Sequence, residues 1–243
     1  SPVYGRGHIA RCILLAKALR SKGADCRFFL TDRLQIDGLE SFPTSLLTDG
    51  LPPSGNIVIV DGYRFAPSCL EKLKASSARL VAIDDLADRD FPADVILNHN
   101  LYATDLDYQR HGSAKLLLGL RYCLVRSEYC QLAGQSSPST PAVLITLGSG
   151  PLASSAEQLA RTINRQFGIR VDATLGADTQ LPNDNSDTLH FHRFVELSQL
   201  IANASLVICG LGVTFLEVMA TGRQVIGVQV ADNQRLAYRA AAS

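Results

Sequence analysis

Two short segments of this 243-residue chain combine glycines with side chains that can bind anions or move a proton. The first is Gly5-Arg6-Gly7-His8, with Arg11 one helical turn later. Glycines allow tight turns and close backbone approach, and free N–H groups at a helix start attract anions. A histidine there could activate water as a general base, because its pKa lies near neutrality. The competing interpretation makes His8 an ordinary surface residue of a first helical turn, and this segment alone favours neither. The glycine spacing fits neither the dinucleotide fingerprint nor the P-loop.

The second segment is Gly210-Leu211-Gly212-Val213-Thr214, which follows an apolar run and opens a helical pattern. Such a turn can present backbone N–H groups to a diphosphate. Glu217, one turn inside, could accept hydrogen bonds from ribose hydroxyls. The alternative is a capping box in which Thr214 caps the helix and Glu217 reaches back to it, and for this segment alone the capping box is favoured. Asn233 and Gln234 follow the next apolar strand, which is a ligand-binding position in α/β folds but also a place for turn residues.

Apolar runs alternate with helical patterns along the chain, which predicts an α/β fold of parallel sheets covered by helices. We expect helices over residues 8–22, 67–75, 154–166, 195–202 and 213–221. We expect strands over residues 26–30, 57–60, 80–83, 95–97, 115–118, 143–147, 171–175, 189–192, 206–209 and 225–230.

A small, polar, proline-bearing stretch divides this pattern and is typical of a linker. It predicts an N-terminal α/β domain over residues 1–133, a linker over 134–142 and a C-terminal α/β domain over 143–243. Two such domains facing a central cleft are the economical architecture, because open parallel sheets bind ligands beyond their strand carboxyl ends. The chain opens directly in a glycine-rich turn, and its only methionine is Met219, so we also expect that a first strand precedes residue 1.

The composition excludes several classes of function. The chain has 23 basic and 23 acidic residues, a formal net charge of zero and 47% hydrophobic residues, as in a soluble globular protein. A balanced charge offers no broad surface for nucleic acid or an anionic membrane. No apolar run approaches the roughly 18 residues of a membrane span, and no signal peptide pattern opens the chain, so we expect a cytoplasmic protein. The six cysteines form no CxxC pair and are interpreted as small buried hydrophobes.

An ordered set of motifs runs from the first residues to the last dozen. It comprises Gly5-Arg6-Gly7-His8-Ile9-Ala10-Arg11-Cys12, Asp61-Gly62-Tyr63, Asp84-Asp85-Leu86, Asn98-His99-Asn100, Gly119-Leu120-Arg121-Tyr122-Cys123-Leu124-Val125-Arg126-Ser127-Glu128-Tyr129, Thr214-Phe215-Leu216-Glu217 and Asn233-Gln234. This set resembles the UDP-2,4-diacetamido-2,4,6-trideoxy-β-L-altropyranose hydrolase family of pseudaminic acid biosynthesis. The resemblance implies a GT-B fold, with two Rossmann-type domains, similar to the UDP-N-acetylglucosamine transferase of peptidoglycan synthesis. Because that family continues beyond this chain's last residue, it also implies a missing C-terminal element.

The resemblance implies hydrolysis of a UDP-sugar to UDP and the free diacetamido sugar, with water attacking and inverting the anomeric carbon. His8 matches the catalytic histidine, Tyr63 and Asn233 match positions that line the sugar, and Thr214 and Glu217 match the UDP end. The remaining substrate-binding residues that it implies are Gly5, Gly7, Arg11 and Gln234. UDP leaves as a stabilised anion, so one base and diphosphate stabilisation suffice. A small-molecule UDP-sugar is thus the implied partner, with no metal and no cofactor, and we expect a monomer or weak oligomer.

One departure from the family pattern, one aspartate pair and two rival functions remain beside this interpretation. Gly148-Ser149-Gly150-Pro151 lacks the carboxylate that the family carries there. The Asp84-Asp85 pair is interpreted as a carboxylate dyad or, preferably, as a cap that holds the next segment and its loops. The first rival is a GT-B glycosyltransferase that passes the sugar to an acceptor hydroxyl. The second is a non-catalytic sugar-nucleotide-binding module, which His8 argues against and the missing carboxylate argues for.

Overall fold

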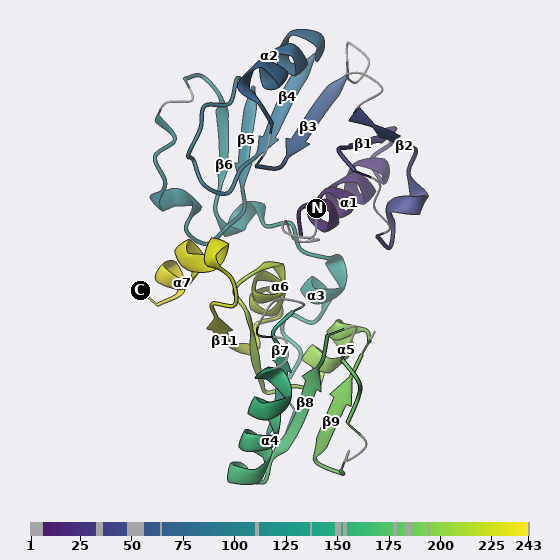
Figure 1. Ribbon diagram of the computed structural model, residues 1–243, viewed down its shortest axis with the longest axis vertical. Coiled ribbons are helices and arrows are strands. Elements are labelled where there is room, and N and C mark those ends of the chain that lie inside the picture. Colours follow the sequence, from purple (N-terminus) through teal and green to yellow (C-terminus); the bar gives the residue numbers. More distant parts are fainter. Residues whose placement is uncertain are drawn as a thin grey trace. The chain divides into compact units, whose positions relative to one another are not determined.

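The computed structural model describes residues 7–32, 36–47, 56–63, 65–109, 112–136, 138–148, 152, 155–176, 179–182, 186–193 and 195–242. The chain forms two compact units, Ser1–Leu124 and Val125–Ser243 (Figure 1). Every pair of neighbouring strands in the sheets of the described segments is parallel. The predicted α/β class with parallel sheets is therefore confirmed.

The first unit contains two parallel sheets. Its elements are α1 (Gly7–Arg20), β1 (Phe28–Leu30), η1 (Leu39–Ser41), β2 (Thr44–Leu46), β3 (Ile57–Asp61), α2 (Pro67–Ser76), β4 (Arg79–Ile83), β5 (Val95–Asn98), η3 (Ala103–Asp105), β6 (Lys115–Leu118) and η5 (Leu120–Tyr122). The larger sheet has the order β3-β4-β5-β6, and β1 pairs with β2 in a sheet of two strands. Helix α1 packs against this smaller sheet through Ile13 and Ala16, which join Leu39 and Phe42 in one buried cluster.

Alternation of buried side chains explains the larger sheet. Val58 and Val60 of β3 point into the core with Leu80 and Ala82 of β4. Helix α2 begins with Pro67 in its first turn, where proline's missing N–H costs nothing, and it covers this core. The strands end at one edge of the sheet, and that edge carries the polar side chains described below.

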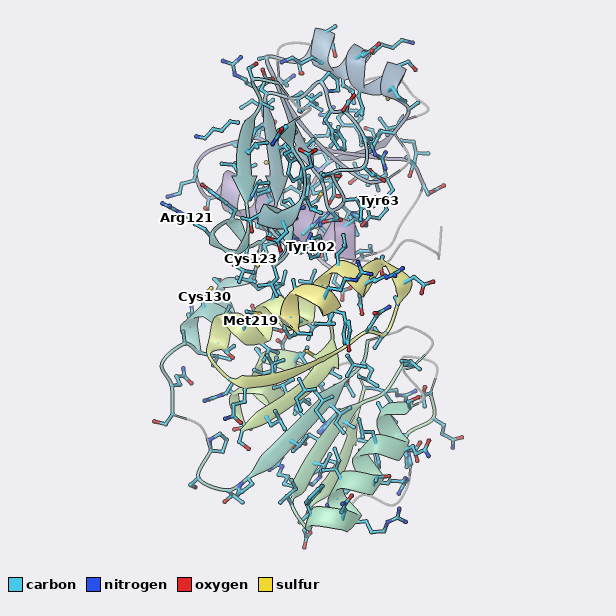
Figure 2. The ribbon with its side chains drawn as sticks, turned by 90° about the vertical axis from the view of Figure 1, so that its left-hand side faces the viewer. Tyr63, Tyr102, Arg121, Cys123, Cys130 and Met219 are labelled. Carbon is cyan, nitrogen blue, oxygen red and sulfur yellow. The ribbon has the colours of Figure 1, made fainter. Side chains whose placement is uncertain are left out.

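The second unit is built on one five-stranded sheet of order β11-β10-β7-β8-β9. Its elements are α3 (Ser127–Gln131), β7 (Ala142–Thr146), α4 (Ser155–Phe167), β8 (Arg170–Thr174), β9 (Leu189–His192), α5 (Leu197–Ala202), β10 (Leu206–Gly210), α6 (Val213–Thr221), β11 (Gln224–Val228), η6 (Asp232–Gln234) and α7 (Arg235–Ala241). Helix α4 packs on β7, β8 and β9, because the small side chains of Ala156 and Ala160 allow a close approach. Helix α6 packs on β10, β11 and α3, and Figure 2 labels Met219 on α6 and Cys130 on α3.

Several predicted boundaries differ from the structure. The division between units follows Leu124 and so precedes the linker predicted at residues 134–142, because α3 already packs on α6. The predicted strand at 26–30 is shorter, and β2 and α7 were not predicted. The interpretation of the cysteines as buried hydrophobes is wrong except for Cys209, since Cys130 is exposed and the other four are partly exposed. Within the described part of the chain, no helix has the length and apolar character that crossing a membrane requires.

Candidate active site

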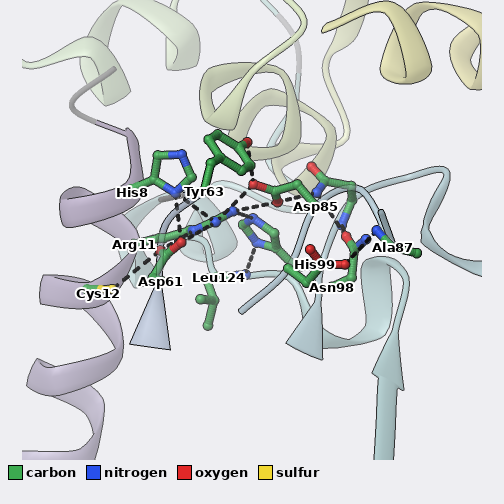
Figure 3. A network of polar contacts seen from close by, with 12 residues as sticks. His8, Arg11, Cys12, Asp61, Tyr63, Asp85, Ala87, Asn98, His99 and Leu124 are labelled. Carbon is green, nitrogen blue, oxygen red and sulfur yellow. Dashed lines mark hydrogen bonds and ion pairs between the residues drawn. The ribbon is translucent and has the colours of Figure 1, made fainter. Parts of the chain in front are cut away.

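The carboxyl edge of the larger sheet in the first unit gathers a network of polar side chains (Figure 3). Asp61 is the last residue of β3, Asp85 follows β4, and His99 follows β5. The parallel register aligns the ends of these strands, and this edge is where open parallel sheets place ligand sites. The first turns of α1 bring His8 and Arg11 to the same edge.

Arg11 lies at the centre of the network and is only 6% exposed. Its Nε and Nη2 donate to Oδ2 and Oδ1 of Asp61, both at 2.6 Å. Its Nη1 and Nη2 donate to Oδ1 and Oδ2 of Asp85, at 2.8 and 3.0 Å. One guanidinium thus bridges two carboxylates, each through a paired contact of the kind that gives arginine its geometric specificity.

Mutual pairing decides the ionisation of these three groups. Burial alone would raise the pKa of Asp61, but hydrogen bonds from Arg11 and His8 outweigh it and hold that pKa below its ordinary value. Burial likewise opposes ionisation of Asp85, and the charge and hydrogen bonds of Arg11 lower its pKa well below the ordinary value. Burial would lower the pKa of Arg11, yet its two carboxylate partners raise it. The network therefore carries two ionised carboxylates around one cation.

His8 lies in the first turn of α1, and one of its ring nitrogens contacts a carboxylate. Its Nδ1 lies 2.7 Å from Oδ1 of Asp61, and its side chain is 22% exposed. The ring of Tyr63 packs edge-on against the imidazole, with centroids 4.7 Å apart and planes at 87°. The Tyr63 hydroxyl donates to Oδ2 of Asp85 at 2.8 Å. Burial and the neighbouring Asp85 raise the pKa of Tyr63, so the phenol stays protonated and remains a donor.

His99 lies next to Arg11 in the network and is 1% exposed. The N–H of Leu124 points at its Nδ1 from 3.1 Å, and Nη1 of Arg11 lies 3.3 Å from its Nε2. Burial and the charge of Arg11 lower the pKa of His99 to about 4. This ring is therefore neutral at pH 7. Leu124 is also the last residue of the first unit, so the network reaches the point where the chain leaves that unit.

Asp84 has a different role from its neighbour. Its Oδ2 accepts the N–H of Ala87 and the hydroxyl of Tyr108, both at 2.7 Å. Ala87 has a φ of 52°, a left-handed conformation that costs energy for alanine and that the hydrogen bond from its N–H helps to hold. The interpretation of the aspartate pair as a loop-holding cap is confirmed for Asp84, whereas Asp85 belongs to the network around Arg11.

Apart from Gly7, the other predicted site residues that the structure describes lie in the second unit. Thr214 and Glu217 are on α6, and Asn233 and Gln234 form part of η6. The favoured capping box is wrong, because α6 already begins at Val213 after Gly212, with no side-chain cap, and Thr214 is inside the helix. Gly7 is the first residue of α1. Gly5 and the segment 149–151 lie outside the described residues.

Glu217 is a buried ion-pair partner. Its carboxylate is 5% exposed and accepts hydrogen bonds from Nε and Nη2 of Arg126, at 2.8 and 3.2 Å. Arg126 also donates to the Tyr129 hydroxyl and lies over the Tyr129 ring. Burial raises the pKa of Glu217 even against the lowering effect of Arg126. Both carboxylate oxygens are thus occupied by the segment that enters the second unit.

Gln234 folds back toward the turn before α6. Its Oε1 accepts the N–H of Val230 at 2.9 Å. Its Nε2 lies 3.6 Å from where a side chain on Gly212 would begin. The structure therefore brings Gln234 to the glycine turn, while Asn233 is exposed. In the described residues, no three histidine, cysteine, aspartate or glutamate side chains converge in a way that could hold a metal ion.

Three members of the network were missed at the level of sequence. Asp61 and His99 appeared only within motifs, Asp85 was interpreted only as half of the Asp84-Asp85 pair, and none was placed beside His8. The usable signal was their position, because each ends or directly follows a predicted strand of one parallel sheet, and such residues meet at one edge. Arg126 carried no comparable signal, since its partner Glu217 is distant in the sequence.

Comparison with known proteins extends only to the fold. No protein-family model matches the chain, and no curated protein matches its sequence. Among solved structures, the chain is similar to MurG of Acinetobacter baumannii, a GT-B glycosyltransferase, with a TM-score of 0.57 and 16% sequence identity. The match covers 97% of this chain and 80% of the MurG chain. The chain has a fold of the GT-B type.

Proposed function

We propose that this protein hydrolyses a UDP-sugar, with a UDP-diacetamido-trideoxy-hexose as the substrate, and that His8 is the general base. Water attacks the anomeric carbon, the bond from that carbon to the diphosphate oxygen breaks, and UDP leaves with the electron pair. The proton of the attacking water passes to His8 and from there to solvent. The products are UDP and the free sugar, which serves nonulosonic (pseudaminic) acid or surface polysaccharide synthesis.

The observation that carries this proposal is the placement of His8. A carboxylate holds one ring nitrogen at 2.7 Å, and the side chain keeps part of its surface exposed at the carboxyl edge of a parallel sheet. A positioned imidazole of this kind contributes roughly 10²- to 10⁴-fold as a general base. The ordered motifs that resemble the hydrolase family support the choice of water and of the sugar.

The residues of the second unit take the nucleotide in this proposal. The turn before α6 presents backbone N–H groups of the kind that bind diphosphates, and Thr214 and Gln234 lie on or beside it. Tyr63 and Asn233 orient the sugar. Glu217 contributes to this end indirectly, by holding Arg126, because both of its carboxylate oxygens accept hydrogen bonds from that arginine.

A second candidate is transfer of the sugar to an acceptor hydroxyl. The observation that favours it is the similarity in fold to MurG, which is a glycosyltransferase. The same base would then deprotonate the acceptor instead of water. Hydrolysis and transfer share the nucleotide site, so only the fate of the sugar separates them.

The test follows UDP release by phosphorus NMR after incubation with the UDP-diacetamido-trideoxy-altrose in ¹⁸O-water without an acceptor. Hydrolysis predicts UDP, with the heavy oxygen in the sugar and none in the phosphate. Heavy oxygen in the phosphate would overturn attack at the anomeric carbon. UDP binding without release would favour a transferase or a non-catalytic binding module.

A pair of histidine variants tests the assigned base. His8→Ala should lower turnover by roughly a hundredfold or more, while the affinity for UDP stays nearly unchanged. His190→Ala is the matched control, because it removes a part-exposed histidine from β9 of the second unit. Equal loss of UDP binding and of turnover in His8→Ala would contradict the role of general base.

A further inference from the structure

We propose that Asp61 and Arg11 are positioning residues that fix His8 as the tautomer with its proton on Nδ1, so that Nε2 is the atom that accepts a proton in the reaction. The catalytic consequence rests on the hydrolysis proposed above. The tautomer itself is a property of the folded chain and can be measured without substrate.

The short contact between His8 and Asp61 determines where the proton lies. Two atoms that both carry only lone pairs cannot approach to 2.7 Å without a proton between them. Asp61 is ionised, because its pKa is held below the ordinary value. The proton therefore belongs to Nδ1 of His8, and Nδ1 donates to Oδ1 of Asp61. In the neutral ring this leaves the lone pair on Nε2.

The protons of Arg11 also bear on the tautomer of His8. The two protons on Nη2 go to Oδ1 of Asp61 and Oδ2 of Asp85, at 2.6 and 3.0 Å. No Nη2 proton is left for Nδ1 of His8, although the two nitrogens are 3.0 Å apart. Arg11 therefore does not compete with Asp61 for the His8 nitrogen, and among the described residues Asp61 is the partner that sets the tautomer.

The same hydrogen bonds change the role expected for Arg11. Asp61 holds the Nε proton and one Nη2 proton, and Asp85 holds the other Nη2 proton and one Nη1 proton. With four of its five protons bound to carboxylates and only 6% of its surface exposed, the side chain is not placed to bind a diphosphate. Arg11 acts on the reaction through Asp61, by keeping that carboxylate ionised and its oxygens in place.

Asp85 completes the arrangement without touching His8. It holds the far side of the guanidinium through two hydrogen bonds and accepts further ones from Tyr63 and Asn100, at 2.8 and 2.7 Å. When His8 takes a proton from water, the imidazolium lies against an ionised carboxylate. Stabilisation of that charge is the part that a carboxylate plays in histidine-based hydrolysis elsewhere.

The deciding experiment is nitrogen NMR of the folded protein labelled with ¹⁵N-histidine, at a pH where the rings are neutral. The shifts of the two ring nitrogens distinguish the tautomers, and the spectrum of His8→Gln assigns the His8 signals. We expect a pyrrole-like Nδ1 and a pyridine-like Nε2 at His8. A pyridine-like Nδ1 in the wild-type protein would overturn the proposal, and His8→Gln serves only to assign the signals.

Two matched variants distinguish a specific effect of Asp61 on the His8 ring from a general effect of packing. Asp61→Asn and Asp85→Asn each remove one buried carboxylate that pairs with Arg11, but only Asp61 contacts His8. We expect Asp61→Asn to shift His8 toward the Nε2–H tautomer and Asp85→Asn to leave the tautomer unchanged. The same tautomer change in both variants would mean that general packing sets the ring, and the proposal would fail.

Steady-state kinetics of the same two variants tests the effect on catalysis. Asp61→Asn should lower kcat by as much as His8→Ala does, roughly 10²- to 10⁴-fold, with little change in KM. The loss in Asp85→Asn should be much smaller. Absence of UDP release by the wild-type protein would contradict the hydrolase instead, and the NMR result would still decide the tautomer.

Discussion

Arg126 and Glu217 form a two-point ion pair in which the carboxylate is buried and the guanidinium is half exposed. The pair ties the first residues of the second unit to α6. The two partners differ in burial, so breaking the pair has a different energetic cost for each of them. Removal of the arginine leaves a carboxylate in a low-dielectric site, whereas removal of the carboxylate leaves an arginine that water can still reach.

We therefore predict that Arg126→Ala destabilises the protein more than Glu217→Gln does. The arginine variant leaves a buried charged group without its donor, which costs roughly 1 to 3 kcal/mol. The glutamine is neutral and keeps one acceptor for Arg126. Urea unfolding of both variants and of the double variant measures the difference. A larger loss in Glu217→Gln would mean that charge attraction outweighs desolvation at this site.

The raised pKa of Glu217 also predicts a pH dependence of stability. A carboxyl that holds its proton more tightly in the folded state makes the free energy of unfolding fall as pH rises from its ordinary pKa through its folded pKa. Glu217→Gln should lack this contribution, and Arg126→Ala should show a steeper fall, since the lowering effect of the arginine is gone. Unfolding free energies measured between pH 4 and 8 check both slopes, and identical slopes in all three proteins would contradict this.

His99 predicts a second pH dependence of opposite sign. Its pKa is about 4 in the folded state against 6.5 for an unperturbed histidine, so the unfolded chain binds a proton that the folded chain rejects. Stability should be fully present above pH 6.5 and fall with acidification toward pH 4, by roughly 3 kcal/mol at most. His99→Asn keeps an acceptor for the Leu124 N–H and removes the titration. The slope between pH 4 and 6.5 should shrink by about one proton in that variant, and an unchanged slope would contradict the prediction.

How much of this could be predicted from the sequence differs between fold and site. The α/β class followed from the alternation of apolar runs with helical patterns, which depends on local residues. The end of the first unit at Leu124 did not, because it is decided by the packing of α3 on α6, a contact between distant segments. The three-residue strand β2 carries too little periodicity to be separated from a loop, and β1 was predicted two residues too long.

The candidate site shows the same limit. His8 and Tyr63 could be singled out by motif, but the pairing that orients His8 joins residues that are 53 positions apart. Burial of Arg11 by two carboxylates could not be predicted, because a single arginine on a helix is usually exposed. The capping box at Thr214 failed for a local reason, since α6 begins at Val213 and leaves Thr214 inside the helix.

Leu211 and Gly227 give a steric prediction about the glycine turn. A side-chain carbon added at Gly227 would lie 2.3 Å from Cδ2 and 2.9 Å from Cγ of Leu211, which is itself 5% exposed. Gly227→Ala should therefore cost about 1 to 3 kcal/mol through overpacking. The control is Gly212→Ala, whose new carbon would meet nothing closer than 3.6 Å. The double variant Gly227→Ala with Leu211→Ala should lose less stability than the sum of the two single losses, and additive losses would contradict the contact.

Tyr63 offers a way to separate two effects on the site. Its ring packs against His8, while its hydroxyl donates to Asp85. Tyr63→Phe keeps the ring contact and loses the hydrogen bond, so stability at pH 7 should fall by about 1 kcal/mol. The pKa of Asp85 is lowered partly by this hydroxyl, so its stabilising contribution is present above the ordinary carboxyl pKa and is lost on acidification. Tyr63→Phe should consequently lose less further stability than the wild-type protein when the pH falls below 4.

Turnover of two Tyr63 variants tests whether the ring or the hydroxyl acts on the site. If the ring orients His8, kcat should be nearly retained in Tyr63→Phe and should fall clearly in Tyr63→Ala, where the edge-on contact is absent. Tyr102→Phe is the matched control, because Tyr102 is a buried tyrosine at the same end of the first unit, as Figure 2 shows. Equal kcat losses in Tyr63→Phe and Tyr63→Ala would assign the effect to the hydroxyl. The rotation of His8 would then be set by Asp61 alone, and Tyr63 would act through Asp85 or through the sugar.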